Sequence, residues 1–93
     1  MFSHNPRITC KDGFTISVQA HEGAYCQRNT DGVPVTVECR FPSTAPKTAE
    51  LRNYAECFAN TGYTETVYGW VPVEVVQAEL DAHGGIAEGC LPS

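Results

Sequence analysis

Apolar and polar residues alternate along two segments of the chain, and this alternation predicts two β-strands. In residues 14–20 every second residue is apolar, and in residues 33–41 the apolar positions are Val33, Val35, Val37, Cys39 and Phe41. Successive side chains of a strand point to opposite faces, so each strand should bury one face and expose the other. If the two strands are neighbours, their polar faces form one surface made of Thr15, Ser17, Gln19, Thr36, Glu38 and Arg40.

Two further strands are predicted near the start and in the second half of the chain. Residues 8–10 are joined to residues 14–20 by Lys11-Asp12-Gly13, and Asp-Gly between two β-rich segments is a strong hairpin signal. Residues 64–71 are rich in Thr, Tyr and Val, and this strand should end before Pro72, which has no N–H to donate. We expect residues 21–32 to form a loop and residues 86–93 a fraying tail.

Helical spacing occurs in two segments. In residues 46–58 it places one apolar stripe on a helix, made of Leu51, Tyr54, Ala55 and Phe58. The second helix is predicted over residues 72–83, where Pro72 suits its first position and Gly84-Gly85 its end. Its larger stripe of Val73, Val76 and Leu80 should face the sheet. A smaller stripe either packs under a loop, which we favour, or forms a contact surface: Val75, Ala78 and Ala82.

These elements predict an α+β fold, with an antiparallel sheet of about four strands and one or two helices packed on one face. No linker or repeat divides the chain, so we expect a single domain over residues 1–93, with residues 1–6 and 87–93 as flexible tails. Helices on one side would leave the other face of the sheet open. That face is a candidate docking surface.

Length and composition favour a binding protein over an enzyme. The chain has 93 residues, of which 42% are hydrophobic and 18% charged, as in an ordinary globular domain. So short a chain has little interior for an enclosed active site. Common catalytic and phosphate-binding motifs are absent from the sequence. We therefore predict no enzymatic activity and no cofactor. The sequence shows neither a membrane-length apolar run nor a signal peptide, so we expect a cytoplasmic protein without membrane contact.

The cysteines are widely spaced, without a Cys-x-x-Cys pair: Cys10, Cys26, Cys39, Cys57 and Cys90. An odd number without a secretory signal favours reduced thiols, with Cys10 and Cys39 as buried apolar residues. The alternative is a metal site, for which close ligand pairs are missing: Cys10, His21, Cys26 and Cys57. A nucleophile–base pair of Cys26 and His21 lacks a third group to orient it. We predict neither metal nor catalytic residues.

Charge is unevenly distributed along the chain. All six Lys and Arg residues lie in the first 52 positions beside five acids, whereas the other 41 residues hold six acids. The low pI of about 5.0 argues against general DNA binding, but leaves local contacts open through a few basic residues and a stacking tyrosine. An acidic helix would suit a basic partner, although solubility alone explains it equally well. The predicted partner-binding residues are Lys11, Tyr25, Arg28, Glu38, Arg40, Glu74, Glu79 and Asp81.

Two segments resemble a group of small bacteriophage-encoded accessory proteins. One spans residues 8–20 with the following Tyr25-Cys26, and the other spans residues 66–76 and continues to His83-Gly84-Gly85. The resemblance is weakest over residues 41–62. It implies a phage protein made in an infected bacterium. Small acidic phage proteins of α+β make-up are similar to anti-CRISPR proteins, which inhibit a CRISPR-Cas effector by occupying it.

The function that this resemblance implies is stoichiometric inhibition of a host CRISPR-Cas effector. The partners would be protein subunits of the effector, with the guide RNA as a further contact, since effectors hold nucleic acid in basic channels. One alternative is a phage accessory protein that binds another host or phage protein. Another is a small Cys/His metal-binding protein. The resemblance transfers no contact residue to this chain.

Overall fold

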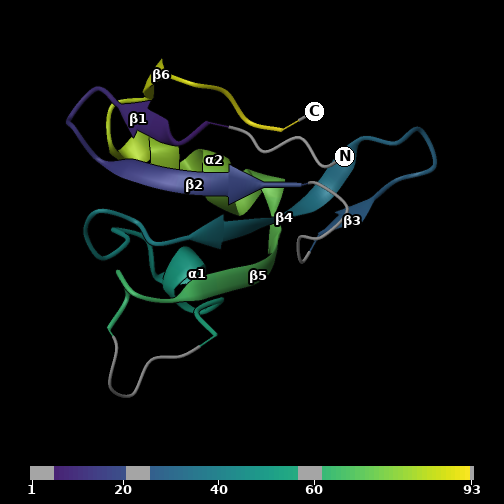
Figure 1. Ribbon diagram of the computed structural model, residues 1–93, viewed down its shortest axis with the longest axis horizontal. Helices are drawn as coiled ribbons and strands as arrows, with labels where there is room; N and C mark the ends of the chain where they lie inside the picture. Colours follow the sequence, from purple (N-terminus) through teal and green to yellow (C-terminus); the bar gives the residue numbers. More distant parts are fainter. Residues whose placement is uncertain (1–5, 21–25, 57–61, 93) are drawn as a thin grey trace.

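The computed structural model describes residues 6–20, 26–56 and 62–92, which form six strands and two helices. The first four strands are β1 (Ile8–Cys10), β2 (Thr15–Gln19), β3 (Gln27–Arg28) and β4 (Pro34–Arg40). They are followed by α1 (Ala49–Arg52), β5 (Val67–Pro72), α2 (Val73–Ala82) and β6 (Ile86–Glu88) (Figure 1). This confirms the predicted α+β class, with slightly more strands than the four expected.

Strand β4 lies at the centre of an antiparallel sheet. Thr36 pairs with Pro72 of β5 on one edge of β4 and with Gln27 of β3 on the other. Because Cys39 pairs with β5 and also with Val18 of β2, β2 and β3 follow one another along the same edge of β4. Beyond β2 the sheet continues through β1 to β6.

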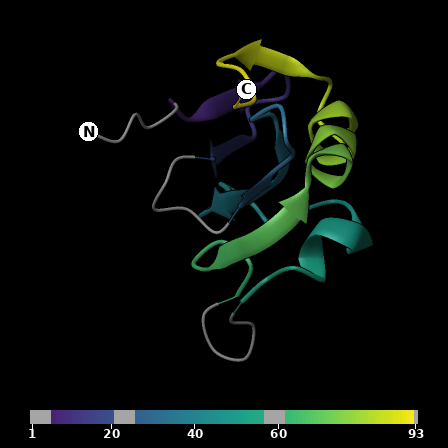
Figure 2. The same ribbon diagram turned by 90° about the vertical axis from the view of Figure 1, so that its right-hand side faces the viewer.

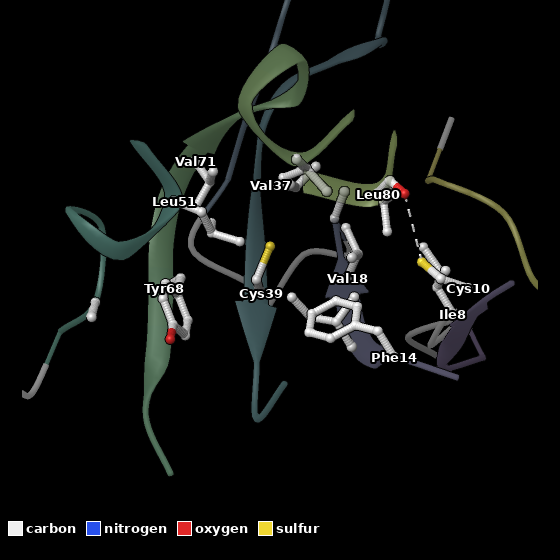
Figure 3. Close-up of a cluster of buried hydrophobic side chains, with 14 residues drawn as sticks. Ile8, Cys10, Phe14, Val18, Val37, Cys39, Leu51, Tyr68, Val71 and Leu80 are labelled. Atoms are coloured by element: carbon white, nitrogen blue, oxygen red, sulfur yellow. Dashed lines mark hydrogen bonds between the residues drawn. The ribbon is translucent and has the colours of Figure 1, made fainter. Parts of the chain in front are cut away.

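Both helices pack on the same side of this sheet (Figure 2). The larger apolar stripe of α2 faces the sheet as predicted, with Val76 and Leu80 fully buried and Val73 packed against the core. Leu51 of α1 is also fully buried. Side chains from β1, β2, β4 and β5 or their ends and from both helices meet in this layer (Figure 3): Ile8, Cys10, Phe14, Val18, Val37, Cys39, Leu51, Tyr68, Val71 and Leu80.

Helix α2 has nearly the predicted bounds. Strand β5 includes Pro72, which is the residue before the helix and not its first residue. At the other end Gly84 has φ +89°, and the N–H of Gly85 donates to the carbonyl of Leu80 at 2.9 Å, which ends the helix. The smaller stripe does not pack under a loop as we favoured, because Ala78 and Ala82 are exposed.

The first predicted helix, residues 46–58, is much shorter than expected. Helix α1 begins only after Thr48, whose side chain accepts from the N–H of Leu51. After Asn53 the chain pairs with β5: Ala55 forms a bridge with Tyr68, and the N–H of Glu56 donates to the carbonyl of Val67 at 2.8 Å. Sheet pairing therefore replaces the second half of the predicted helix. Phe58 lies outside the described residues.

Two strands lie where none was predicted. Ile86–Glu88 form β6, paired with β1, so the expected flexible tail does not begin at residue 86 or 87. Gln27–Arg28 form β3 inside the predicted loop of residues 21–32. Both strands are short and carry exposed residues, so neither shows the alternation of apolar and polar residues from which a strand is predicted. Neither described helix has the length or apolar character needed to cross a membrane.

The two ends of β4 depart from the predicted burial. Val37 and Cys39 face the core as expected, but Val33, Val35 and Phe41 are about half exposed. At its start β4 extends past β2 and pairs with β3, whose two residues are themselves exposed. At its other end the alternation stops because Phe41 has a left-handed backbone, with φ +46°.

Candidate functional site

The polar residues of β2 and β4 share one face of the sheet, as the alternation predicted. Ser17 pairs with Arg40, and Gln19 with Glu38. Thr9 of β1 pairs with Thr15 and extends the same face. Both helices cover the opposite side (Figure 2). We call this side, which neither described helix covers, the open face. Its residues include Thr9, Thr15, Ser17, Gln19, Thr36, Glu38 and Arg40, of which Gln19 and Glu38 are buried.

Trp70 lies in a β-bulge of β5 and is about half exposed. Gly69 and Trp70 of β5 together lie opposite the single residue Glu38 of β4. Tyr68 and Val71, on either side of them, are buried in the core, and Gly69 is buried as well, so Trp70 is the exposed residue of the bulge. Trp70 is 47% exposed and has φ +50°. A left-handed backbone costs a residue other than glycine about 1–2 kcal/mol.

Phe41 is the second exposed aromatic residue with a left-handed backbone. It follows β4 directly, and its side chain is 48% exposed. Arg7 crosses the open face to reach it: Nε donates to Oγ1 of Thr15 at 3.0 Å, and Nη2 donates to the carbonyl of Phe41. Phe41 is three residues from Glu38, which is about 10 Å along a strand. Two strained aromatic residues therefore occur within one short stretch of the sheet.

Arg40 lies between these two aromatic positions. Its Nε and Nη2 atoms are each 2.6 Å from Oε1 of Glu38. The side chain of Arg40 is 37% exposed, whereas that of Glu38 is only 3% exposed. Glu38, predicted as a contact residue, is thus too buried to touch a partner, and it orients the guanidinium of Arg40. The open face therefore presents an oriented cation, in a stretch of the sheet that also holds two half-exposed aromatic residues.

The other basic candidates lie away from this group. Arg28 donates to the carbonyl of Gly32 at 2.6 Å and to that of Ala20, so it joins the end of β2 to the β3–β4 turn. Lys11 lies in the β1–β2 turn, where its N–H donates to Gly85 beyond the end of α2 at 3.0 Å. The structure does not bring these cations together with Arg40. Tyr25 lies outside the described residues.

The three acidic candidates of α2 have different surroundings. Glu74 and Asp81 are exposed, and Asp81 accepts from the side chain of Gln77 at 3.0 Å. Glu79, which we also predicted as a partner-binding residue, is fully buried. The expectation for Glu79 was wrong because its carboxylate is enclosed by hydrogen-bond donors. Only Glu74 and Asp81 of the three can meet a partner.

Glu79 belongs to an ionic cluster with His83 and Asp12. The Nε2 atom of His83 is 2.7 Å from Oε2 of Glu79, and its Nδ1 atom is 2.7 Å from Oδ2 of Asp12. The ring of Phe14 stacks on the imidazole at 3.8 Å with an interplanar angle of 7°. Lys47 also belongs to the cluster, with Nζ 3.7 Å from Oδ2 of Asp12. The cluster connects the β1–β2 turn, α2 and the segment before α1.

Hydrogen bonds hold both carboxylates of this cluster in the charged form. For Asp12, the N–H of Phe14 is the main cause of a lowered pKa, followed by the contacts with His83. For Glu79, burial alone would raise the pKa, but the N–H groups of Lys47 and Thr48, the Thr48 hydroxyl and His83 together lower it. A fully buried carboxylate therefore remains an acceptor because it has four donors around it.

A shallow pocket of about 280 Å³ opens beside the cluster. It is lined by Asp12, Gly13, Phe14, Ser43, Thr44, Lys47 and His83. Both ring nitrogens of His83 contact carboxylates, and one ring face is covered by Phe14, so no nitrogen points to the pocket to accept a substrate proton. The geometry of the cluster is suited to joining three elements, and not to nucleophile activation.

Cys10, one of the cysteines considered as metal ligands, and the buried Cys39 are both held as thiols. Burial is the main cause that raises the pKa of Cys10 and of Cys39, and a protonated thiol is a poor nucleophile and metal ligand. His21 and Cys57 lie outside the described residues, so the two alternatives that we did not favour, the four-ligand site and the Cys26–His21 pair, are not tested. Among the residues that the structure does describe, no three His, Cys, Asp or Glu side chains are placed to hold a metal ion.

No sequence pattern indicated that Trp70, Phe41 and Arg7 are surface residues in one part of the sheet. A bulge and a left-handed backbone both interrupt the alternation on which strand prediction depends. Asp12 and His83 are 71 positions apart, and only the docking of the hairpin on α2 brings them together. No protein-family model, curated protein or solved structure matches the chain.

Proposed function

We propose that this protein is a stoichiometric binding protein that docks through the open face of its sheet. The observation that carries the proposal is the pair of half-exposed aromatic residues, Trp70 and Phe41, held at positive φ. Strained backbone persists where function requires it, and exposed Trp and Arg side chains are the usual anchors of protein interfaces. Arg40, in the same stretch of the sheet, supplies an oriented cation.

The proposed partner is a protein subunit of a host CRISPR-Cas effector, with the guide RNA as a further contact. This choice of partner is supported by the resemblance to phage accessory proteins noted in the sequence. The exposed acids of α2 are compatible with it, because a basic nucleic-acid channel would attract Glu74 and Asp81. The alternative is another host or phage protein bound through the same face.

The test is binding by purified protein to CRISPR effector complexes, measured by co-elution and by loss of target-DNA binding. Trp70→Gly and Phe41→Gly should each weaken binding at least tenfold, or about 1.4 kcal/mol, because they remove an anchor while relieving backbone strain. Val35→Thr is the matched control, since Val35 is as exposed as Trp70 but lies at the far end of β4. It should bind as wild type does.

The possible outcomes test the docking surface and the identity of the partner separately. If no effector binds, but a single host or phage protein binds wild type and not Trp70→Gly, the open face is retained and the alternative partner replaces the effector. If Trp70→Gly, Phe41→Gly and the control all bind equally well, the open face is not the docking surface. Elemental analysis of the purified protein addresses the metal-binding alternative, which stoichiometric zinc would support.

A further inference from the structure

The guanidinium groups of Arg7 and Arg40 are both oriented by hydrogen bonds to the sheet. Nε of Arg7 donates to Oγ1 of Thr15 at 3.0 Å, and its Nη2 donates to the carbonyl of Phe41. Nε and Nη2 of Arg40 are each 2.6 Å from Oε1 of Glu38. A guanidinium carries five N–H donors, and Nη1 of neither arginine has a partner among the described residues. Both groups therefore offer further donors in a set direction.

The two arginines are anchored at neighbouring positions of the open face. Arg40 pairs with Ser17 of β2, and Thr15, which accepts from Arg7, lies two residues before Ser17 on the same strand face. Such positions are about 7 Å apart. The carbonyl that Arg7 contacts belongs to Phe41, the residue directly after Arg40. Alternate side chains of an extended chain have the same spacing, so an extended segment of a partner could present one acceptor to each arginine.

Carboxylates of the chain neutralise this pair only in part. Glu38 forms an ion pair with Arg40, and its side chain is only 3% exposed. No described acidic side chain forms an ion pair with Arg7, and the exposed Glu65 and Glu88 are paired with neither arginine. Two cations beside one carboxylate leave a local positive charge on a chain whose net charge is −5. Such a position favours an anionic group of a partner.

The surrounding cations favour an acidic protein segment over a nucleic acid as the source of this anion. A nucleic-acid backbone is bound by a series of cations, one for each phosphate contact. Lys11 lies against Gly84 beyond the end of α2, and Lys47 donates to the carbonyl of Ala82 in α2. Arg28 is engaged by carbonyls at the end of β2 and in the β3–β4 turn. These cations do not continue the pair into a track for phosphates.

We propose that Arg7 and Arg40 form a recognition site for an extended acidic segment of the protein partner, with carboxylates at positions i and i+2. The site rests on the proposed docking through the open face, and names the chemistry that the face recognises. A carboxylate accepts well from the parallel N–H groups of a guanidinium. Trp70 and Phe41, half exposed in the same stretch of the sheet, supply apolar contact area beside the charged groups.

The test needs no natural partner, because a short peptide serves as the probe. NMR signals of the arginine side chains of the full chain are followed during titration with acetyl-Glu-Ser-Glu-amide, and acetyl-Gln-Ser-Gln-amide is the uncharged control. The acidic peptide should shift the signals of Arg7 and Arg40 with a dissociation constant of about 1 mM, as expected for a few charge-assisted contacts. The control peptide should leave both signals in place. Equal shifts with the two peptides, or none with either at about 10 mM, overturn the inference.

Variants locate the bound peptide on the molecule. Arg7→Gln, at an exposed residue, should weaken peptide binding about fivefold. Arg40→Lys should weaken it as well, because lysine keeps the charge but loses the planar fork. Lys11→Gln makes the same charge change as Arg7→Gln away from the pair, and should bind as wild type does. Equal losses in Arg7→Gln and Lys11→Gln overturn the site, and the wild-type titration decides the question even where a variant does not fold.

Two further outcomes separate this site from other interpretations. A single-stranded oligouridine that binds more tightly than the acidic peptide, and shifts the same two arginines, would replace the acidic segment with a nucleic acid and overturn the inference. If Trp70→Gly keeps full binding to the partner while the peptide still binds at Arg7 and Arg40, docking through the open face fails and the acidic-segment site is retained. If Trp70→Gly loses the partner but the peptide does not bind, the acidic-segment site alone fails.

Discussion

At the scale of single residues, Trp70 and Phe41 are the positions where the backbone departs from what their side chains prefer. Both have φ near +50°, a region that glycine tolerates and bulky residues avoid. Because both side chains are about half exposed, packing in the core explains only part of why aromatic residues occupy these strained positions. The strain is thus a residue-level sign of a role at the surface.

A comparison of Gly and Ala at position 70 measures this strain. Trp70→Gly should have a free energy of unfolding about 1 kcal/mol larger than Trp70→Ala, because only glycine relieves the left-handed backbone. The control is Val35, which is equally exposed in the same sheet but does not have a positive φ. At position 35 the Gly variant should be less stable than the Ala variant by about 0.5–1 kcal/mol. Urea unfolding measures both pairs, and the same order at both positions would contradict the assignment of strain.

At the scale of elements, sequence patterns were reliable where periodicity met a clear stop signal. Helix α2 and the β1–β2 hairpin lie where they were predicted, because Gly13, Gly84 and Gly85 adopt positive φ at the turn and at the end of the helix. The helix over residues 46–58 failed because its apolar stripe also suits pairing with β5, a tertiary contact that local spacing does not contain. The ionic cluster could not be predicted either, because Asp12 and Glu79 look like ordinary polar residues in sequence.

Glu79 provides the sharpest test of how α1 is positioned. Glu79→Gln places a donor against the N–H and hydroxyl donors of Lys47, Thr48 and His83, so unfolding should become easier by about 2–4 kcal/mol. Glu74→Gln on the exposed side of α2 should change stability by less than about 0.5 kcal/mol. Thermal and urea unfolding of both variants are the measurements. Equal losses of stability in the two variants would mean that the buried carboxylate of Glu79 does not position α1.

The same carboxylates predict how the fold responds to acid. Asp12 and Glu79 have lowered pKa values in the folded state, so their contribution is complete above the ordinary carboxyl range and is lost as the pH falls below about 4. The free energy of unfolding of wild type should therefore decline more steeply between about pH 5 and about pH 3 than that of Glu79→Gln. Parallel slopes would show that Glu79 binds its proton equally well in both states.

At the scale of the whole molecule, two surfaces of different character lie on opposite sides of the sheet. The open face carries Arg40, with Trp70 in the same stretch of the sheet, whereas the exposed side of α2 carries Glu74 and Asp81. The open face as a plane could be predicted from the alternation of β2 and β4. Its aromatic anchors could not, because the bulge shifts the register by one residue.

Charge reversal distinguishes the two surfaces once a partner is available. If docking uses the open face alone, the double variant Glu74→Lys with Asp81→Lys should change the association rate and its salt dependence, but alter the dissociation rate less than twofold. Surface plasmon resonance at low and high salt measures both rates. A large rise in the dissociation rate would place α2 inside the interface and contradict docking through the open face alone.

The pairing of β1 with β6 has a consequence for the order of events during synthesis. Thr9, near the start of the chain, is opposite Glu88, and a side chain at Gly89 would press against the backbone of Ile8. The outer edge of β1 thus stays without its neighbour until residues 86–88 have been synthesised and can pair with it. Nascent chains stalled before Ile86 should therefore expose an unpaired strand edge and recruit chaperones, while chains that include β6 close that edge themselves.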